Sequence, residues 1–157
     1  MTFSKALLSS NKMDWSTPQT LFDQFNEEFD PISLDVAAWD WNAKCPVWLT
    51  PLDDALSLDW SRVCHDVLGV KPLVWCNPPY GRQISKWVEK MRLEAVDNSS
   101  ATVALLPART GPGWFHKHIW DKTNQRPWWW VSDFRLLSGR LKFEGATNIA
   151  PLSISVA

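Results

Sequence analysis

The sequence predicts an α/β domain in which helices flank a mostly parallel sheet. Short apolar runs that are typical of buried strands alternate with longer segments in which apolar residues recur at helical spacing. The chain has 157 residues, which is enough for one domain with a substantial core and too few for two. No internal repeat and no low-complexity linker interrupts it. We therefore expect a single layered domain.

The first predicted elements are an arm and a helix. Residues 1–13 are polar and weakly patterned, so we expect a mobile arm there, followed by one domain over 14–157. Thr17 and Pro18 are typical of a helix start, with Thr17 as the N-cap and Pro18 as the first helical residue. Apolar residues at helical spacing then support a helix to about Phe29.

Strands dominate the rest of the chain. The uninterrupted apolar run 101–106 is typical of a strand buried on both faces. Residues 83–96 place apolar side chains on one helical face, and the Gly- and Pro-containing segment 109–127 is expected to be loop and short helix. The predicted strands are 32–36, 46–49, 72–76, 101–106, 128–134, 140–143 and 152–156.

The chain contains twelve tryptophans, three of them consecutive. Neighbouring residues of a strand point to opposite faces, so Trp128, Trp129 and Trp130 cannot all point inward. We expect either Trp129, or the pair Trp128 and Trp130, to meet solvent, a helix or a ligand.

Composition argues against several classes of protein. The three cysteines are odd in number and lack CxxC spacing, and His116 and His118 have no accompanying ligand set, so we expect neither disulfides nor a metal site. No run is long and apolar enough to span a membrane, and no signal pattern opens the chain. We expect a cytoplasmic protein, in the host cytoplasm if a phage or prophage encodes it. The net charge of −1 does not by itself indicate a nucleic-acid partner.

The most informative segment is Asn77-Pro78-Pro79-Tyr80, between a predicted strand and a predicted helix. The two prolines fix φ and remove two backbone donors, which leaves the carbonyls of Asn77 and Pro78 to accept hydrogen bonds from another group. With the Asn77 side-chain oxygen they form an acceptor cluster suited to an exocyclic NH₂, and Tyr80 can stack on a flat heterocycle. Open α/β sheets bind ligands at this end of their strands.

Other polar residues follow strands that end at the same edge of the predicted sheet. Asp35 and Asp54 can accept hydrogen bonds from ribose hydroxyls, a charged amine or an adenine amine, or can simply cap a helix or turn. Arg109 follows the buried strand 101–106, where it could contact a phosphate or form a surface salt bridge.

A series of motifs resembles the phage-type (Dam-like) DNA N6-adenine methyltransferases from about Trp15 to the end of the chain. Asn-Pro-Pro-Tyr alone also occurs in enzymes that methylate RNA bases and protein glutamine amides, but the ordered series is more specific. The motifs are Trp15-Ser16-Thr17-Pro18, Leu34-Asp35-Val36-Ala37-Ala38, Asn42-Ala43-Lys44-Cys45, Asp54-Ala55-Leu56, Asn77-Pro78-Pro79-Tyr80, Leu105-Leu106-Pro107-Ala108-Arg109 and Gly139-Arg140-Leu141-Lys142-Phe143.

The resemblance implies a Rossmann-like S-adenosylmethionine-dependent methyltransferase fold and methyl transfer to an adenine flipped out of double-stranded DNA. It implies that Asn77, Pro78, Pro79 and Tyr80 form the catalytic segment. The segment that begins at Asp35 lacks the Gly-rich turn of a dinucleotide site, so NAD is not expected; the phage-type family shares this abbreviated form. The implied cofactor-binding residues are Trp15, Thr17, Pro18, Asp35, Ala37, Asn42 and Asp54.

DNA contacts are expected from 109–127, because this stretch is both loop-like and locally basic through Arg109, Lys117, Lys122 and Arg126. It is small for a target-recognition domain, so we expect no separate large one, and a monomer or weak dimer. Two alternatives stay open. One is N-methylation of an RNA base or a protein amide; the other is a catalytically dead methyltransferase fold that serves as an interaction protein.

Overall fold

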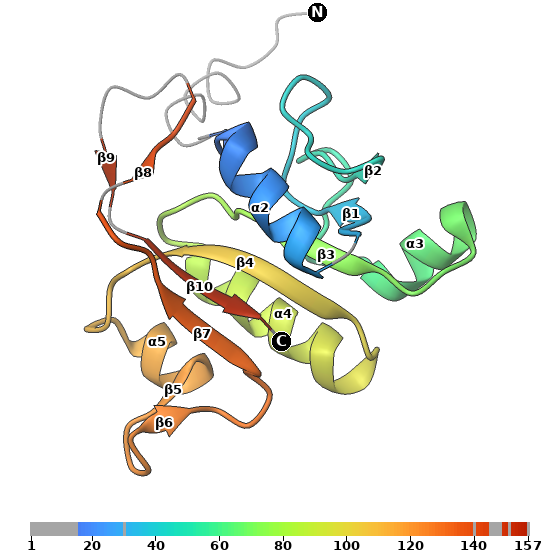
Figure 1. The fold of residues 1–157 in the computed structure, drawn as a ribbon. Helices are drawn as coiled ribbons and strands as arrows, with labels where there is room; N and C mark the ends of the chain where they lie inside the picture. Colours follow the sequence, from blue (N-terminus) through green and yellow to red (C-terminus); the bar gives the residue numbers. More distant parts are fainter. Residues whose placement is uncertain (1–15, 30, 140, 145–148, 151, 157) are drawn as a thin grey trace, which may run out of the picture.

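The computed structural model describes residues 16–29, 31–139, 141–144, 149–150, 152–156. The expected arm over 1–13 and Trp15 lie outside these residues. The main sheet has six strands in the order β2-β1-β3-β4-β10-β7, with helices on both faces (Figure 1). The predicted α/β class with a mostly parallel sheet is confirmed. The strands are β1 (Leu34–Asp35), β2 (Val47–Trp48), β3 (Leu73–Cys76), β4 (Ala101–Pro107), β7 (Asp133–Leu136) and β10 (Leu152–Val156).

The direction of the strands brings several loops to one edge. Strands β2, β1, β3 and β4 are mutually parallel, whereas β10 runs antiparallel between β4 and β7. Strand β7 therefore points the same way as the parallel four. As a result, the loops that follow β1, β3 and β4 leave the sheet at the same edge. The remaining elements are α2 (Gln19–Phe29), α3 (Trp60–Leu68), α4 (Ile84–Asp97), α5 (Gly113–His118), β5 (Trp120–Asp121), β6 (Arg126–Pro127), β8 (Leu141–Lys142) and β9 (Ile149–Ala150).

Two apolar layers cover the sheet because successive strand residues point to opposite faces. On β3, Val74 and Cys76 pack into a core shared with α3, α4 and α5. Trp75 points the other way, where the ring of Phe22 on α2 meets it edge to face at 5.3 Å. The predicted strand 101–106 is confirmed as doubly buried, since its residues alternate between the two cores.

The predicted strand over 128–134 is wrong over residues 128–132. The N–H of Val131 donates to the carbonyl of Trp128 over 2.9 Å, which closes a turn, and β7 begins only at Asp133. The indole N–H of Trp128 also donates to the carbonyl of His116, and this contact holds the turn against α5. Trp130 is buried and Trp129 is 78% exposed. The expectation that Trp129 meets solvent is therefore confirmed, although its backbone is not a strand.

Helix α3 was absent from the predicted elements, although its sequence carries start and stop signals. The carboxylate of Asp59 accepts the N–H of Arg62 at the N-cap, and Gly69 ends the helix with φ +70°. Between them, Trp60 and Cys64 point into the core at helical spacing. An Asp before the apolar pattern and a Gly after it were sufficient to find this helix.

A buried ion pair within α4 is hydrogen-bonded to the start of α3. Glu94 is fully buried; one carboxylate oxygen accepts the N–H of Trp60 over 3.2 Å and the other pairs with Lys90. The ammonium of Lys90 lies 5.5 Å from the centre of the Trp60 ring. We expect Glu94→Ala to lower the free energy of unfolding by about 3–5 kcal/mol, because it leaves a buried cation and an amide without an acceptor. Urea titration measures this, with the exposed Lys86→Ala on the same helix as a control that should change stability by less than about 0.5 kcal/mol. A loss below about 1 kcal/mol for Glu94→Ala would contradict the buried pair.

Candidate active site

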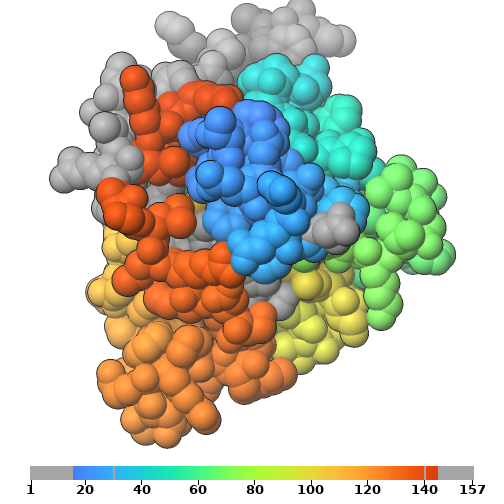
Figure 2. Space-filling view, viewed as in Figure 1, coloured from blue at the N-terminus to red at the C-terminus, as the bar shows by residue number. Residues whose placement is uncertain are grey.

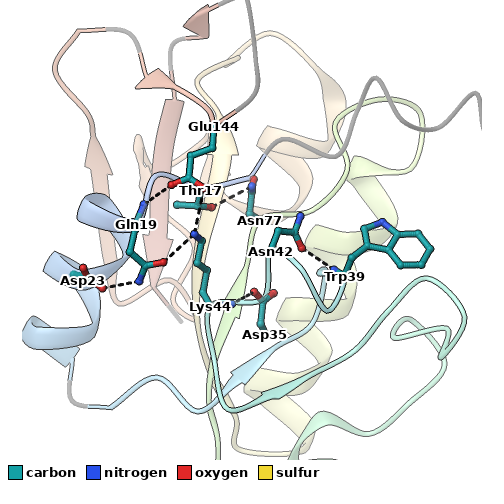
Figure 3. A network of polar contacts seen from close by, with 9 residues as sticks. All are labelled: Thr17, Gln19, Asp23, Asp35, Trp39, Asn42, Lys44, Asn77 and Glu144. Carbon is teal, nitrogen blue, oxygen red and sulfur yellow. Dashed lines mark hydrogen bonds and ion pairs between the residues drawn. The ribbon is translucent and has the colours of Figure 1, made fainter.

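A polar cluster lies where the loops after β1 and β3 approach the start of α2 (Figure 3). Its side chains come from segments far apart in the sequence, and they enclose a cavity of about 10 Å³, room for about one water molecule. The cavity is lined by Ser16, Thr17, Asp35, Ala37, Ala38, Asn42, Lys44, Trp75 and Asn77.

Asn77 leaves the buried strand β3 and points toward the start of α2. Its amide nitrogen donates to the hydroxyl of Thr17 over 3.2 Å (Figure 3). The Thr17 side chain is almost fully buried at 2% exposure, so its position is set by packing. Because the amide nitrogen of Asn77 bonds to Thr17, the oxygen of the same amide faces away from Thr17.

The predicted helix start at Thr17 and Pro18 is shifted by one residue. The carbonyl of Pro18 accepts the N–H of Phe22 over 3.1 Å, so Pro18 holds the cap position and Gln19 is the first helical residue. Thr17 is therefore not the N-cap, and its hydroxyl serves Asn77. The N–H of Gln19 donates instead to the carboxylate of Glu144, 125 positions away, over 3.1 Å.

The rest of the Asn77–Tyr80 segment runs without regular structure from β3 toward α4. Pro78 is buried, while Pro79 and Tyr80 are half-buried. The hydroxyl of Tyr80 donates to the carbonyl of Leu105 over 3.3 Å, and the ring meets Phe143 at 6.2 Å and 75°. Burial, and secondarily the Cys76 thiol, raises the pKa of Tyr80 well above its usual range. Tyr80 is thus a neutral ring anchored to β4.

Asp35 is buried at the end of β1 and organises the loop that follows. One carboxylate oxygen accepts the N–H of Ala37 over 3.2 Å, and the other accepts the N–H of Lys44 over 3.1 Å. Burial raises the pKa of Asp35 to about 6, although these two hydrogen bonds oppose the shift. Each oxygen keeps a second lone pair for a further donor.

The loop over 37–44 is held from within by Asn42. Its side-chain oxygen accepts the N–H of Trp39 over 2.7 Å, and the carbonyl of Trp39 accepts the N–H of Ala43 over 2.9 Å. The indole of Trp39 stacks on that of Trp41 at 5.0 Å, and Trp41 is 71% exposed. Asn42 thus shapes the cavity wall.

Lys44 joins three segments at the rim of the cavity. Its ammonium donates to the side chain of Gln19 over 3.0 Å and lies 3.7 Å from the carboxylate of Glu144 (Figure 3). Sequence reasoning did not select Lys44, Gln19 or Glu144 as site residues. Lys44 stood inside a quoted motif, whereas no local signal marks Glu144, whose role depends on a contact between distant parts of the chain.

Of the other residues predicted to bind the cofactor, some lie at the cavity and one does not. Ala37 lines the cavity, and Pro18 follows Thr17 at its edge. Asp54 lies on an exposed turn after β2, with φ +50°, and does not line the cavity. A role for Asp54 in cofactor binding stays a prediction.

The four predicted DNA-binding residues are exposed. Arg109 follows β4 at the same sheet edge as Asn77. Lys117, on α5, lies 3.7 Å from the carboxylate of Glu89 on α4. Lys122 and Arg126 belong to the β5–β6 hairpin, which lies on the β7 side of the sheet, away from β1 and β2 (Figure 1). In the space-filling view this orange segment forms the lower end of the molecule, apart from the blue surface of α2 (Figure 2).

The described residues bring together no group of three or more His, Cys, Asp or Glu side chains that could hold a metal ion. None of their helices has the length and apolar character needed to cross a membrane.

Comparison with known proteins decides the family. A model of the family described as DNA N-6-adenine-methyltransferase (Dam) matches residues 4–150. The chain belongs to this family. Membership in the Dam family makes the chain a methyltransferase at the level of the family and confirms the resemblance found in the sequence.

Two relatives agree with this assignment. The chain is 31% identical over 111 residues to the "DNA N-6-adenine-methyltransferase" of Haemophilus phage HP1 (strain HP1c1), a match that covers 68% of this chain and 56% of the phage protein. It is 38% identical over 66 residues to the "Putative methyltransferase YfdM" of Escherichia coli (strain K12), covering 42% of this chain and 69% of that protein. The chain thus spans little more than half the length of the phage relative. No solved structure matches.

The buried Asp35 predicts a pH dependence of stability. Its pKa is about 6 in the folded protein, against 3.8 for an exposed carboxyl. Between these values the folded state binds more protons than the unfolded state, so stability falls as the pH rises from about 4 to about 6 and then levels off. The loss is about 3 kcal/mol. Subtracting the unfolding free energy of Asp35→Asn from that of the wild type at each pH isolates this contribution. A difference that stays flat from pH 4 to pH 7 would contradict it.

Proposed function

We propose that this chain is an S-adenosylmethionine-dependent DNA methyltransferase that methylates N6 of an adenine flipped out of duplex DNA, on a Rossmann-like methyltransferase fold. The observation that carries the proposal is the Asn77–Tyr80 segment at the carboxyl end of β3, in a chain of the Dam family. The name of the phage relative supports DNA adenine as the substrate.

The lining of the cavity fits a polar, cationic cofactor. S-adenosylmethionine supplies the methyl group on its sulfonium. Asp35 offers a buried carboxylate with remaining lone pairs for a hydroxyl or a cation, and Thr17 and Asn42 add polar groups.

Asn77 and Pro78 act on the substrate amine. The lone pair of an adenine amine is delocalised into the ring, which makes the nitrogen a poor nucleophile. The Asn77 side-chain oxygen and the Pro78 carbonyl accept its two hydrogens, which favours a pyramidal nitrogen with its lone pair directed at the methyl group. These acceptors also stabilise the positive charge that develops on nitrogen during transfer.

Thr17 acts as a positioning residue for Asn77. An amide side chain has a donor end and an acceptor end, and only the acceptor end suits an amine substrate. Because the buried Thr17 hydroxyl holds the nitrogen end, the oxygen end faces away from α2. This role differs from the cofactor contact expected from the sequence.

Tyr80 supplies a stacking surface for the base. Its hydroxyl is bound to the Leu105 carbonyl, so the ring is fixed to β4. Flipping a base out of a duplex costs a few kcal/mol, and stacking on an anchored ring offsets part of that cost.

The decisive experiment follows labelled methyl from S-adenosylmethionine into unmethylated duplex DNA, with nucleoside analysis of the product. N6-methyladenine is the expected product. Methylation of RNA or of a peptide amide, without methylation of DNA, would show that the proposed substrate is wrong. Absence of any transfer together with no cofactor binding by calorimetry would overturn the proposal and indicate an interaction protein.

A further inference from the structure

A second, larger cavity lies outside the polar site. It has a volume of about 420 Å³ and lies between α5, the β5–β6 hairpin and β7. Thr110, three residues after the end of β4, places it beside the loop that carries Arg109. The lining residues are Thr110, Phe115, His116, Trp120, Phe134 and Leu136, which we call the aromatic groove.

Aromatic rings form the walls of the aromatic groove. The ring of Phe134 lies 6.1 Å from that of Phe115 and 6.0 Å from that of Trp120. Trp120 and Phe134 are half-buried, and Leu136 at the rim is 66% exposed. A flat group that enters the groove therefore meets ring surface that solvent now contacts. His116 adds a polar atom, since its buried Nδ1 has no hydrogen-bond partner among the described residues.

The segment around the aromatic groove, residues 109–127, carries positive charge, which favours an anionic ligand. Residues 109–127 hold four Lys and Arg side chains and one carboxylate, whereas the whole chain has a net charge of −1. That carboxylate, Asp121, is buried and accepts hydrogen bonds from Thr123 and Asn124 within the hairpin turn. The exposed charge of this segment is thus positive, with Lys117 offset in part by Glu89. Apolar rings beside exposed cations favour a ligand that is flat and anionic.

We propose that the aromatic groove binds one unpaired nucleobase of the DNA strand by stacking, while Arg109 contacts the neighbouring phosphate. This inference rests on the proposed function, because flipping an adenine out of the duplex leaves the thymine opposite it without a partner. The groove is of the size typical of small-ligand sites, large enough for a base with its sugar. Stacking on aromatic side chains between cations is how proteins hold unpaired bases regardless of sequence.

The test uses single-stranded oligonucleotides that contain 2-aminopurine, whose fluorescence falls on stacking, and fluorescence anisotropy for affinity. We expect Trp120→Ala to weaken binding roughly 10- to 100-fold and to abolish the quenching. Trp120→Phe should keep most of both. The control is Trp129→Ala, because Trp129 is 78% exposed and does not line the groove; it should change affinity less than about twofold.

A second variant distinguishes a direct effect on binding from a loss of folding in Trp120→Ala. Leu136 is exposed, so Leu136→Asp should fold normally while placing a carboxylate at the groove rim, and it should also weaken binding at least tenfold. Wild-type affinity in both Trp120→Ala and Leu136→Asp would overturn the inference even if methyl transfer proceeds. A dimer that Leu136→Asp disrupts would also overturn it, by showing that a second chain fills the groove. DNA binding that depends on the groove, without any methyl transfer, would support the inference and refute the proposed function.

Discussion

Asn77→Ala is expected to reduce the rate of methyl transfer about 10²- to 10³-fold while leaving the affinity for S-adenosylmethionine within about threefold of the wild type. The substitution removes the side-chain oxygen that accepts a hydrogen of the substrate amine, and removal of one such preorganised group typically has an effect of this size. The cofactor contacts proposed for Asp35 and Asn42 remain, because the carboxylate of Asp35 and the amide of Asn42 are held by backbone groups of their own loop.

Single-turnover transfer to duplex DNA measures the chemical step, and calorimetry measures cofactor affinity. Asn98→Ala is a matched control, since Asn98 ends α4 at the opposite edge of the sheet from Asn77. Asn77→Asp tests the mechanism further: it keeps an acceptor for the substrate, and the Thr17 hydroxyl can rotate to donate to the new oxygen. We expect it to retain more activity than Asn77→Ala. Transfer by Asn77→Ala at more than a tenth of the wild-type rate would remove Asn77 from the mechanism.

The fold was predictable where local patterns decide it. Strand β4 was predicted to within one residue because an apolar run between Ser100 and Pro107 leaves few alternatives, and α4 because its apolar face repeats at helical spacing. The prediction of a strand was wrong over residues 128–130 because contacts with other segments, and not the local pattern, decide the conformation there. Tryptophan favours strands, yet contacts of Trp128 with Ile119 and His116, which are distant in sequence, hold the segment in a turn.

The candidate site was predictable in its location and less so in its contacts. Asn77 follows β3 and Asp35 ends β1, and parallel strands bring their carboxyl ends to one edge, so the sequence alone places them close together. The partners of Thr17 and Gln19 could not be found in this way. Each bonds to a residue at least 60 positions away, and only the folded chain brings Asn77 and Glu144 to the start of α2.

Thr17→Val is expected to lower kcat about 10- to 100-fold with little change in the affinity for S-adenosylmethionine. Valine has nearly the shape of threonine, so the buried site stays filled, but the amide nitrogen of Asn77 loses the acceptor that orients it. Removing one partner of a hydrogen bond in a partly buried site costs about 1–3 kcal/mol, enough to let the amide rotate to other arrangements. Thr17→Ser restores the hydroxyl and should bring kcat back to within about threefold.

A double-mutant cycle separates positioning from cofactor binding at Thr17. If Thr17 acts only through Asn77, Thr17→Val should slow transfer in the wild type but add nothing in Asn77→Ala, because the group that it orients is already gone. If Thr17 instead contacts the cofactor, as its place before α2 suggested from the sequence, Thr17→Val should weaken cofactor affinity equally in both backgrounds and leave kcat unchanged. Thr17 also lines the cavity, so its location is compatible with either role. The hydrogen bond to Asn77 favours the first, because it gives a buried hydroxyl a specific partner in the proposed catalytic segment.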